Sequence, residues 1–202
     1  LSIGIFGVAS IANSKTIRIG TEGAYPPWNN LNSAGELEGA EIDFGNEACK
    51  RMGVTCEWVT QDWDGIIPAL LQGKYDIIIA GMSITEERKE KVNFTTGYMT
   101  DPASFAVLKN SGLANLNIAG MSKVNLNNAG GKEQAAIGQL IAAMNGATVC
   151  VQSSTIHQNF LEKHMSGAVK VKLYQSVDDH NIDLAAGRCD AILADVGSIV
   201  DF

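Results

Sequence analysis

Two segments of the sequence, residues 64–80 and 178–194, follow one pattern. Each begins with an aspartate, continues through an apolar helical stretch to a glycine, and then passes a basic residue and a second aspartate before an apolar run that ends in alanine. Helices that alternate with apolar strands predict βαβ units on a parallel sheet. The repeat therefore predicts two lobes of similar construction, with a cleft between the facing ends of their strands.

The remaining segments continue the same α/β alternation. Apolar or alternating runs predict strands, and amphipathic runs bounded by capping residues or glycine predict helices. Two polar regions, 29–39 and 110–132, are expected to be loops. The expected strands are 16–20, 54–59, 77–80, 105–108, 147–151, 169–174 and 190–194, and the expected helices are 40–52, 64–71, 83–92, 133–144, 154–161 and 178–186.

The bulk composition limits the possible function classes. The chain has 202 residues, of which 46% are hydrophobic, and a formal net charge of −7. This length supports one large domain or two small ones with a substantial core. The acidic balance argues against a nucleic-acid partner. No apolar stretch reaches the roughly 18 residues that a membrane-spanning helix needs.

The two ends of the sequence carry further expectations. Residues 1–12 are apolar, small and uncharged, like the apolar region of a secretory signal peptide, with 10–12 as a small-residue cleavage site. We expect residues 1–15 to be the remnant of a signal peptide and leader; a first β-strand is the alternative. Residues 201–202 follow a strand and a turn, so we expect the C-terminal part of the fold to be missing.

The four cysteines lie in two kinds of sequence environment. Cys49 and Cys56 lie between a helix end and a strand start, and an exported location favours a disulfide between them. Their spacing matches no common zinc pattern, so no metal site is expected. Cys150 and Cys189 lie in or beside apolar runs and are expected to be buried free thiols.

Residues 75–88, YDIIIAGMSITEER, contain a candidate anion site. A short apolar run predicts a strand buried on both faces, and Gly81 after it allows the backbone to approach a ligand. Ser83 and Glu86 have capping-box spacing, and Arg88 follows about one turn into the predicted helix. Helix N–H groups and a guanidinium both favour a carboxylate. The alternative is that Arg88 belongs to a solvated charged face.

Several motifs occur together that are typical of one protein family. They are GTEGAYPPW, GAEIDFGNEACKRM, CKRMGVTCEWV, DWDGIIPALLQGKYDIIIAGMSIT and AGRCDAILAD. With these motifs the chain resembles the periplasmic solute-binding proteins of the polar amino acid family, the receptors of ABC importers, and within it the lysine/arginine/ornithine-binding and opine-binding branches. The resemblance covers 16–200. Ala40 departs from it, because a larger residue is usual there.

The resemblance implies a fold and a set of roles. The fold is a type II periplasmic binding protein, with lobe 1 in 16–101, a hinge, and lobe 2 in 102–202, from which the return to lobe 1 is absent. Arg88 would hold a ligand α-carboxylate, Asp195 the α-ammonium and Glu22 a cationic tip. Tyr25 and Trp63 would sandwich the ligand side chain. The remaining expected ligand-binding residues are Ala80, Gly81, Met82, Ser83, Ser154 and Thr155.

The implied function is extracytoplasmic substrate binding for an ABC transporter. We expect a periplasmic monomer without a cofactor that binds arginine, lysine, ornithine or histidine and delivers it to a permease in the inner membrane. An opine such as octopine or nopaline is the alternative ligand. The run Ala80-Gly81-Met82 and the polar region 110–132 favour the opine, whereas Asp195 favours a free amine. Ile156 removes a polar side chain that is common in the amino acid branch.

An enzyme is the alternative of another class. Some enzymes that act as cyclohexadienyl dehydratases resemble this fold, and such an enzyme needs a positioned acid or base. Glu22 or His157 could supply that group, although we expect His157 to be a surface or capping residue. No nucleophile elbow, phosphate loop or zinc motif is present in the sequence. A sensor domain fused to a further C-terminal part is a third possibility.

Overall fold

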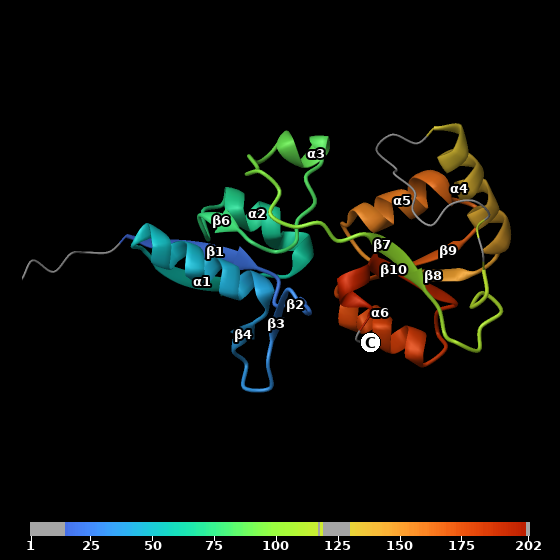
Figure 1. Cartoon of the computed structure of the whole chain (residues 1–202), viewed down its shortest axis with the longest axis horizontal. Coiled ribbons are helices and arrows are strands. Elements are labelled where there is room, and N and C mark those ends of the chain that lie inside the picture. The colour runs from blue at the N-terminus through green and yellow to red at the C-terminus, as the bar shows by residue number, and fades with distance from the viewer. Residues whose placement is uncertain (1–14, 117, 119–129, 201–202) are drawn as a thin grey trace, which may run out of the picture.

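The computed structural model describes residues 15–116, 118 and 130–200 (Figure 1). Two α/β units lie side by side, and the chain between α3 and β7 crosses from one to the other. We call the unit from β1 to α3 lobe 1 and the unit from β7 to η3 lobe 2. The two-lobed α/β architecture predicted from the sequence is confirmed. Residues 1–14 of the expected signal-peptide remnant, 1–15, and residues 201–202 lie outside the described residues.

Lobe 1 contains a parallel three-stranded sheet of order β5-β1-β6 and a small antiparallel sheet of order β2-β3-β4. The second sheet lies in the region 29–39 and just before it, where the sequence predicted only a polar loop, so that prediction was incomplete. The strands are β1 (Thr16–Thr21), β2 (Ala24–Tyr25), β3 (Asn29–Leu31), β4 (Leu37–Glu38), β5 (Thr55–Thr60) and β6 (Ile77–Ile78).

Two apolar clusters hold the helices of lobe 1 against its parallel sheet. Ile19 and Ile79 pack with Cys49 of α1, and a separate cluster joins Tyr75 to Ile66 of α2. Strand side chains alternate between faces, so one sheet can carry a helix on each side. The helices are α1 (Ala40–Met52), η1 (Trp63–Gly65), α2 (Ile66–Leu71) and α3 (Glu86–Lys89).

Lobe 2 is a four-stranded sheet of order β7-β10-β8-β9, in which β7 is antiparallel to β10 and the other pairs are parallel. Alternation along β8 explains its two cores: Val149 and Val151 face one cluster, and Cys150 faces the other. The strands are β7 (Ala103–Ala106), β8 (Thr148–Gln152), β9 (Lys170–Tyr174) and β10 (Ala191–Asp195).

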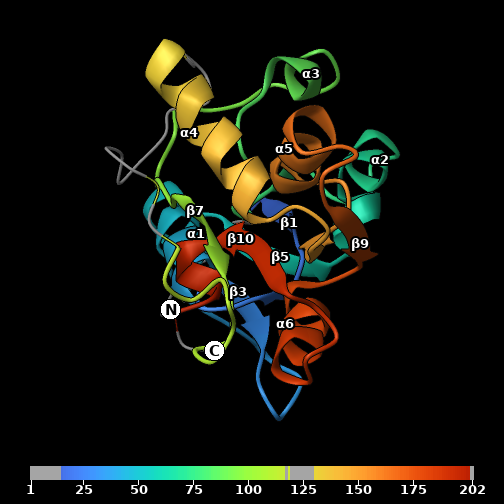
Figure 2. The ribbon, with the colours of Figure 1, turned by 90° about the vertical axis from the view of Figure 1, so that its right-hand side faces the viewer.

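Helices cover both faces of the lobe 2 sheet (Figure 2). α4 and α5 lie on one face, where Leu161 of α5 is fully buried, and α6 lies on the other, where Leu184 is buried. None of the described helices is long and apolar enough to cross a membrane. The elements are α4 (Gly131–Ala143), α5 (Ile156–His164), α6 (Val177–Ala185) and η3 (Val196–Ser198).

Two helices of lobe 1 differ from prediction for identifiable reasons. The helix expected from Asp64 begins at Ile66 after a 3-10 turn, because Pro68 has no N–H to donate to the carbonyl of Asp64. The helix expected over 83–92 is the short α3, capped by Thr85 rather than Ser83. α3 buries no residue, so it lacks the apolar face that stabilises longer helices.

The predicted strand 77–80 also differs from prediction. β6 ends at Ile78 and lies at the edge of its sheet, and Ile77 is 41% exposed. The prediction of a strand buried on both faces was therefore wrong at this position. Other elements shift by a few residues: α5 begins at Ile156 after a Thr155 cap and α6 begins at Val177 after a Ser176 cap, where helices over 154–161 and 178–186 were expected.

Each lobe contains one disulfide. The predicted Cys49–Cys56 bond forms within lobe 1. The prediction of free thiols at Cys150 and Cys189 was wrong, because these residues form a second disulfide. Cys150 lies on β8, and Cys189 lies 39 residues later, just before the neighbouring strand β10. Their Cα atoms are 5.9 Å apart, so the folded sheet brings them together.

Candidate functional site

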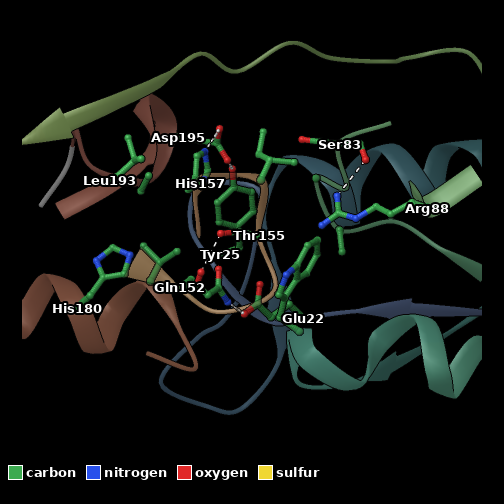
Figure 3. A pocket seen from close by; sticks show the side chains of 16 residues that line it. Glu22, Tyr25, Ser83, Arg88, Gln152, Thr155, His157, His180, Leu193 and Asp195 are labelled. Carbon is green, nitrogen blue, oxygen red and sulfur yellow. Dashed lines mark hydrogen bonds and ion pairs between the residues drawn. The ribbon is translucent and has the colours of Figure 1, made fainter. Parts of the chain in front are cut away.

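The strand ends of both lobes meet at one cavity (Figure 3). Its volume is about 30 Å³, room for about two water molecules. All the predicted ligand residues except Met82 and Ser154 line it. The lining residues are Glu22, Tyr25, Trp63, Ala80, Gly81, Ser83 and Arg88 from lobe 1, and Gln152, Thr155, Ile156, His157, Val177, His180, Leu193, Ala194 and Asp195 from lobe 2.

Met82 and Ser154 line a larger neighbouring groove of about 650 Å³ beside α2, α3 and α5. Ser154 has a φ of 57°, an uncommon conformation for a residue other than glycine. In this conformation its carbonyl accepts hydrogen bonds from Nε1 of Trp63, at 3.1 Å, and Nη2 of Arg88, at 3.2 Å. Ser154 thus contacts the other lobe through its backbone rather than through its hydroxyl.

Arg88 is held rigidly at one end of the cavity. Its Nη1 donates to the carbonyl of Ser83 at 2.9 Å, and its backbone N–H donates to the Thr85 cap at 3.2 Å. The guanidinium carbon lies 5.3 Å from the centre of the Trp63 ring, a cation–π distance. Burial lowers the pKa of Arg88 from its usual value. A half-buried, pre-oriented guanidinium favours a planar anion such as a carboxylate.

Gly81 allows the backbone to pass close to an aromatic wall of the cavity. Its φ is 58°, and a Cβ at this position would lie 2.7 Å from Cε1 of Tyr25. Glycine is the residue that adopts this conformation without strain and leaves that space free. The close approach explains why the predicted turn after β6 and the Tyr25 loop line the same cavity.

Asp195, the last residue of β10, is the acidic group of lobe 2 in the cavity. Its Oδ2 accepts a hydrogen bond from the hydroxyl of Tyr25 at 2.6 Å, which joins the two lobes. Its Oδ1 lies 3.2 Å from Nε2 of His157. Burial and the nearby Asp195 raise the pKa of Tyr25, so the phenol stays protonated and donates. Figure 3 shows these three side chains together.

Glu22 supplies a second carboxylate, from the end of β1. Its Oε1 accepts a hydrogen bond from Nε2 of Gln152 at 2.6 Å. Burial raises the pKa of Glu22 to about 7; the bond from Gln152 opposes the rise, and the carboxylates of Asp178, Asp62 and Asp64 add to it. A cation placed beside Glu22 would favour its charged form.

Sequence reasoning missed two histidines and a glutamine that line the cavity. His157, expected at the surface or as a cap, is only 7% exposed, and His180 is fully buried. Nε2 of His157 faces Oδ1 of Asp195 at 3.2 Å, and neither ring nitrogen of His180 has a hydrogen-bond partner among the described residues. Burial lowers the pKa of His180 to about 4, so its ring is neutral at pH 7. The position of Gln152 at a strand end was the signal that could have identified it.

The comparison with known families gives one match that covers most of the chain. Residues 17–165 match the family described as bacterial extracellular solute-binding proteins, family 3. The octopine-binding periplasmic protein of Rhizobium meliloti is 44% identical over 91% of this chain and 62% of its own length. The chain therefore spans less than two thirds of that relative.

Two further proteins are similar over nearly the whole chain. The L-arginine-binding protein of Pseudomonas aeruginosa is 34% identical over 100% of this chain and 69% of its own length. The crystal structure of an ancestral amino acid-binding protein, a precursor of cyclohexadienyl dehydratase, has a TM-score of 0.73 and 30% identity, and the match covers 90% of this chain and 71% of that one.

Proposed function

We propose a function from one premise: this chain belongs to the bacterial extracellular solute-binding proteins, family 3, which act outside the cytoplasm. The function is to bind a basic amino acid between the two lobes and deliver it to an ABC permease in the inner membrane. One observation carries the proposal. Arg88 and the acidic residues Asp195 and Glu22 lie around a single inter-lobe cavity.

The charges suit a zwitterion with a cationic side chain. Arg88 takes the α-carboxylate, Asp195 takes the α-ammonium, and Glu22 takes the cationic tip. Tyr25 and Trp63 hold the aliphatic part of the side chain between them. Charge-assisted hydrogen bonds in a buried site are stronger than neutral ones, so this pattern favours arginine, lysine, ornithine or histidine over neutral amino acids.

Entry of an amino acid requires the lobes to separate, because a cavity of about 30 Å³ is far smaller than the roughly 300 Å³ at the lower end of usual ligand pockets. We place the hinge at the boundary between 16–101 and 102–202, where the chain crosses between the lobes (Figure 1). The ligand shifts the open–closed equilibrium by its preference for the closed arrangement.

Isothermal titration calorimetry with arginine, lysine, ornithine, histidine, citrulline and glutamine tests this proposal. The expected result is binding of the cationic ligands and much weaker binding of citrulline, which has the shape of arginine without its charge. Arg88→Ala should remove binding of every ligand, and the distant K163A should not. Equal affinity for arginine and citrulline would contradict the role of Glu22.

An opine is the second candidate ligand. An opine carries a further carboxylate beside its amine. His157, which lies beside Asp195, and His180 both offer buried ring nitrogens in the cavity that could donate to such a group. The octopine-binding relative supports the same reading. Comparison of octopine with N2-ethylarginine separates the effect of the carboxylate from that of substituent size: a tighter octopine complex that weakens in H157F, and not in H164Q, favours the opine.

A binding role is better supported than catalysis, because the relatives described above are binding proteins. The structural likeness to a dehydratase precursor leaves Glu22 and His157 as the acid–base candidates for an enzyme. Incubation with prephenate or arogenate and detection of the aromatic product decide between the two. Turnover that disappears in E22Q would replace the receptor proposal with the enzyme.

A further inference from the structure

A buried carboxylate outside the cavity, that of Glu41, touches three segments that surround it. Its residue is 1% exposed. Oε1 accepts hydrogen bonds from the backbone N–H of Gly81, at 2.7 Å, and from the hydroxyl of Tyr98. Oε2 accepts one from Nδ2 of Asn29 at 2.7 Å. All three partners are donors, so they compensate a negative charge that would otherwise be unfavourable to bury.

Two of these partners set the positions of cavity loops. Gly81 itself lines the cavity and packs against the ring of Tyr25. Asn29 is fully buried, and its Oδ1 accepts the N–H of Gly23 at 2.8 Å, which fixes the loop that carries Glu22 and Tyr25. One carboxylate therefore fixes the two lobe 1 loops of the site relative to each other.

The third partner, Tyr98, lies on the segment that crosses between the lobes. Its residue is 45% exposed, and its ring stacks on Phe44 of α1 at a centroid distance of 5.2 Å. Further along this segment, Asp101 accepts hydrogen bonds from Nε1 of Trp28 in lobe 1 and from the N–H of Gly197 in lobe 2, both at 3.1 Å. A rotation of lobe 2 about the crossing therefore acts on the segment that presents the Tyr98 hydroxyl to Glu41.

We propose that Glu41 is a positioning residue for the ligand site and that its bond from Tyr98 couples the ligand loops to lobe closure. The ligand readout rests on the proposed function, whereas the closure readout does not. Hydrogen bonds to a charged group contribute more than neutral ones, so loss of this hydroxyl should disfavour the arrangement in which the lobes are in contact. The proposed ligand complex also holds the lobes closed, so a variant that disfavours closure should lower the affinity.

The first test compares Y98F with Y75F. Both remove one tyrosine hydroxyl, but the hydroxyl of Tyr75 donates to the carbonyl of Ile66 in the core of lobe 1 and bonds to neither Glu41 nor the crossing segment. Spin labels on S33C and E162C report the lobe separation without ligand, and calorimetry with arginine reports affinity.

Y98F should lower the closed fraction and weaken arginine at least about tenfold, the equivalent of 1.4 kcal/mol. Y75F should leave the closed fraction and the affinity for arginine within about threefold of the wild-type values. If Y98F matches the wild type in distance and affinity, or if both variants weaken arginine equally, the proposal is wrong. If the wild type binds none of the amino acids, the proposed function fails while the distances still decide the coupling.

The second test moves the charge within the network. In E41Q one acceptor oxygen must serve three donors, and a flip of the Asn29 amide would face its NH2 group to the N–H of Gly23. N29D added to E41Q restores the match, because the new carboxylate accepts from both Gly23 and the carboxamide.

We expect E41Q to weaken arginine at least about tenfold and E41Q/N29D to recover to within about threefold. N29D alone places two carboxylates side by side, so it should bind arginine more weakly than the double variant does. Wild-type affinity in E41Q, or a double variant no tighter than E41Q, would refute the positioning role. If E41Q does not fold, the Y98F comparison still decides the proposal.

Discussion

Acidification should weaken arginine binding through Glu22. The pKa of Glu22 is raised to about 7, mainly by burial, and the proposed complex needs its charged form beside the guanidinium of the ligand. The sign is therefore fixed: affinity is highest above pH 7 and falls as the pH drops through that value. A bound cation should lower the pKa of Glu22, so Glu22 stays charged in the complex as the pH drops.

The expected magnitude follows from the ionised fraction. With a pKa of about 7, roughly nine tenths of Glu22 is charged at pH 8 and roughly one hundredth at pH 5. The dissociation constant for arginine should rise about a hundredfold over this interval, or about 2.7 kcal/mol. Titration calorimetry at half-unit steps, corrected for buffer ionisation, measures both the affinity and the proton released on binding.

Two controls isolate the effect of Glu22 from the effects of the other polar groups that line the cavity. Citrulline needs no charge at Glu22, so its affinity should change far less than that of arginine. E22Q should bind arginine weakly at every pH and should lose most of the slope. A wild-type slope for arginine that persists in E22Q, or an equal slope for citrulline, would refute the assignment of Glu22 to the cationic tip.

The remaining predictions concern binding and stability. Arg88→Ala should weaken the binding of arginine by more than about a hundredfold in calorimetry, because removal of a buried charged partner typically costs about 3 kcal/mol or more. An affinity within tenfold of the wild type would count against Arg88 as the carboxylate-binding residue. Replacement of Cys150 and Cys189 by alanine should lower the free energy of unfolding of lobe 2 in urea by about 4 kcal/mol. Removal of the Cys49–Cys56 disulfide of lobe 1 should cost about 2 kcal/mol, because loop-closure entropy grows with the sequence separation of the two cysteines. Equal losses would contradict this entropic account. Leu161→Ala should cost about 2–5 kcal/mol in the same assay, because this side chain is fully buried between α5 and the sheet; a loss below 1 kcal/mol would mean that the core repacks freely. Glu22→Gln should raise the free energy of unfolding at pH 8 by up to about 3 kcal/mol and leave it unchanged below pH 4. The reason is that a carboxyl whose pKa is raised in the folded state loses its stabilising contribution as the pH rises from 4.5 through 7. A gain in stability that is larger at pH 4 than at pH 8 would contradict this reasoning.

Local sequence signals were sufficient to predict α1 and to make Arg88 a candidate. α1 begins and ends at the predicted residues, because Gly53 adopts the left-handed conformation that stops it. Glu22 and Asp195 were assigned through the family resemblance, and the structure places both at strand ends beside the same cavity. Arg88 was a candidate from its own segment, because a strand end, a glycine and a capping box precede it, with an ordinary charged run as the alternative.

The remaining features depend on contacts between distant segments. The Cys150–Cys189 pairing needs two adjacent strands, whose order the sequence does not state. The sequence does not show which faces of α5 and α6 are buried. His157 and His180 are buried because of how these two helices pack in the folded protein. Ser154 points its carbonyl into lobe 1 because of a backbone conformation that no residue-type pattern predicts.

The placement of the two disulfides has a mechanical consequence. Cys49–Cys56 reinforces one half of the molecule and Cys150–Cys189 the other, and neither crosses between them. Oxidation outside the cytoplasm thus stiffens two separate bodies while the contacts between them stay noncovalent and reversible. A crosslink between the lobes would add comparable stability but would also prevent the lobe motion on which the proposed capture and delivery of a solute depend.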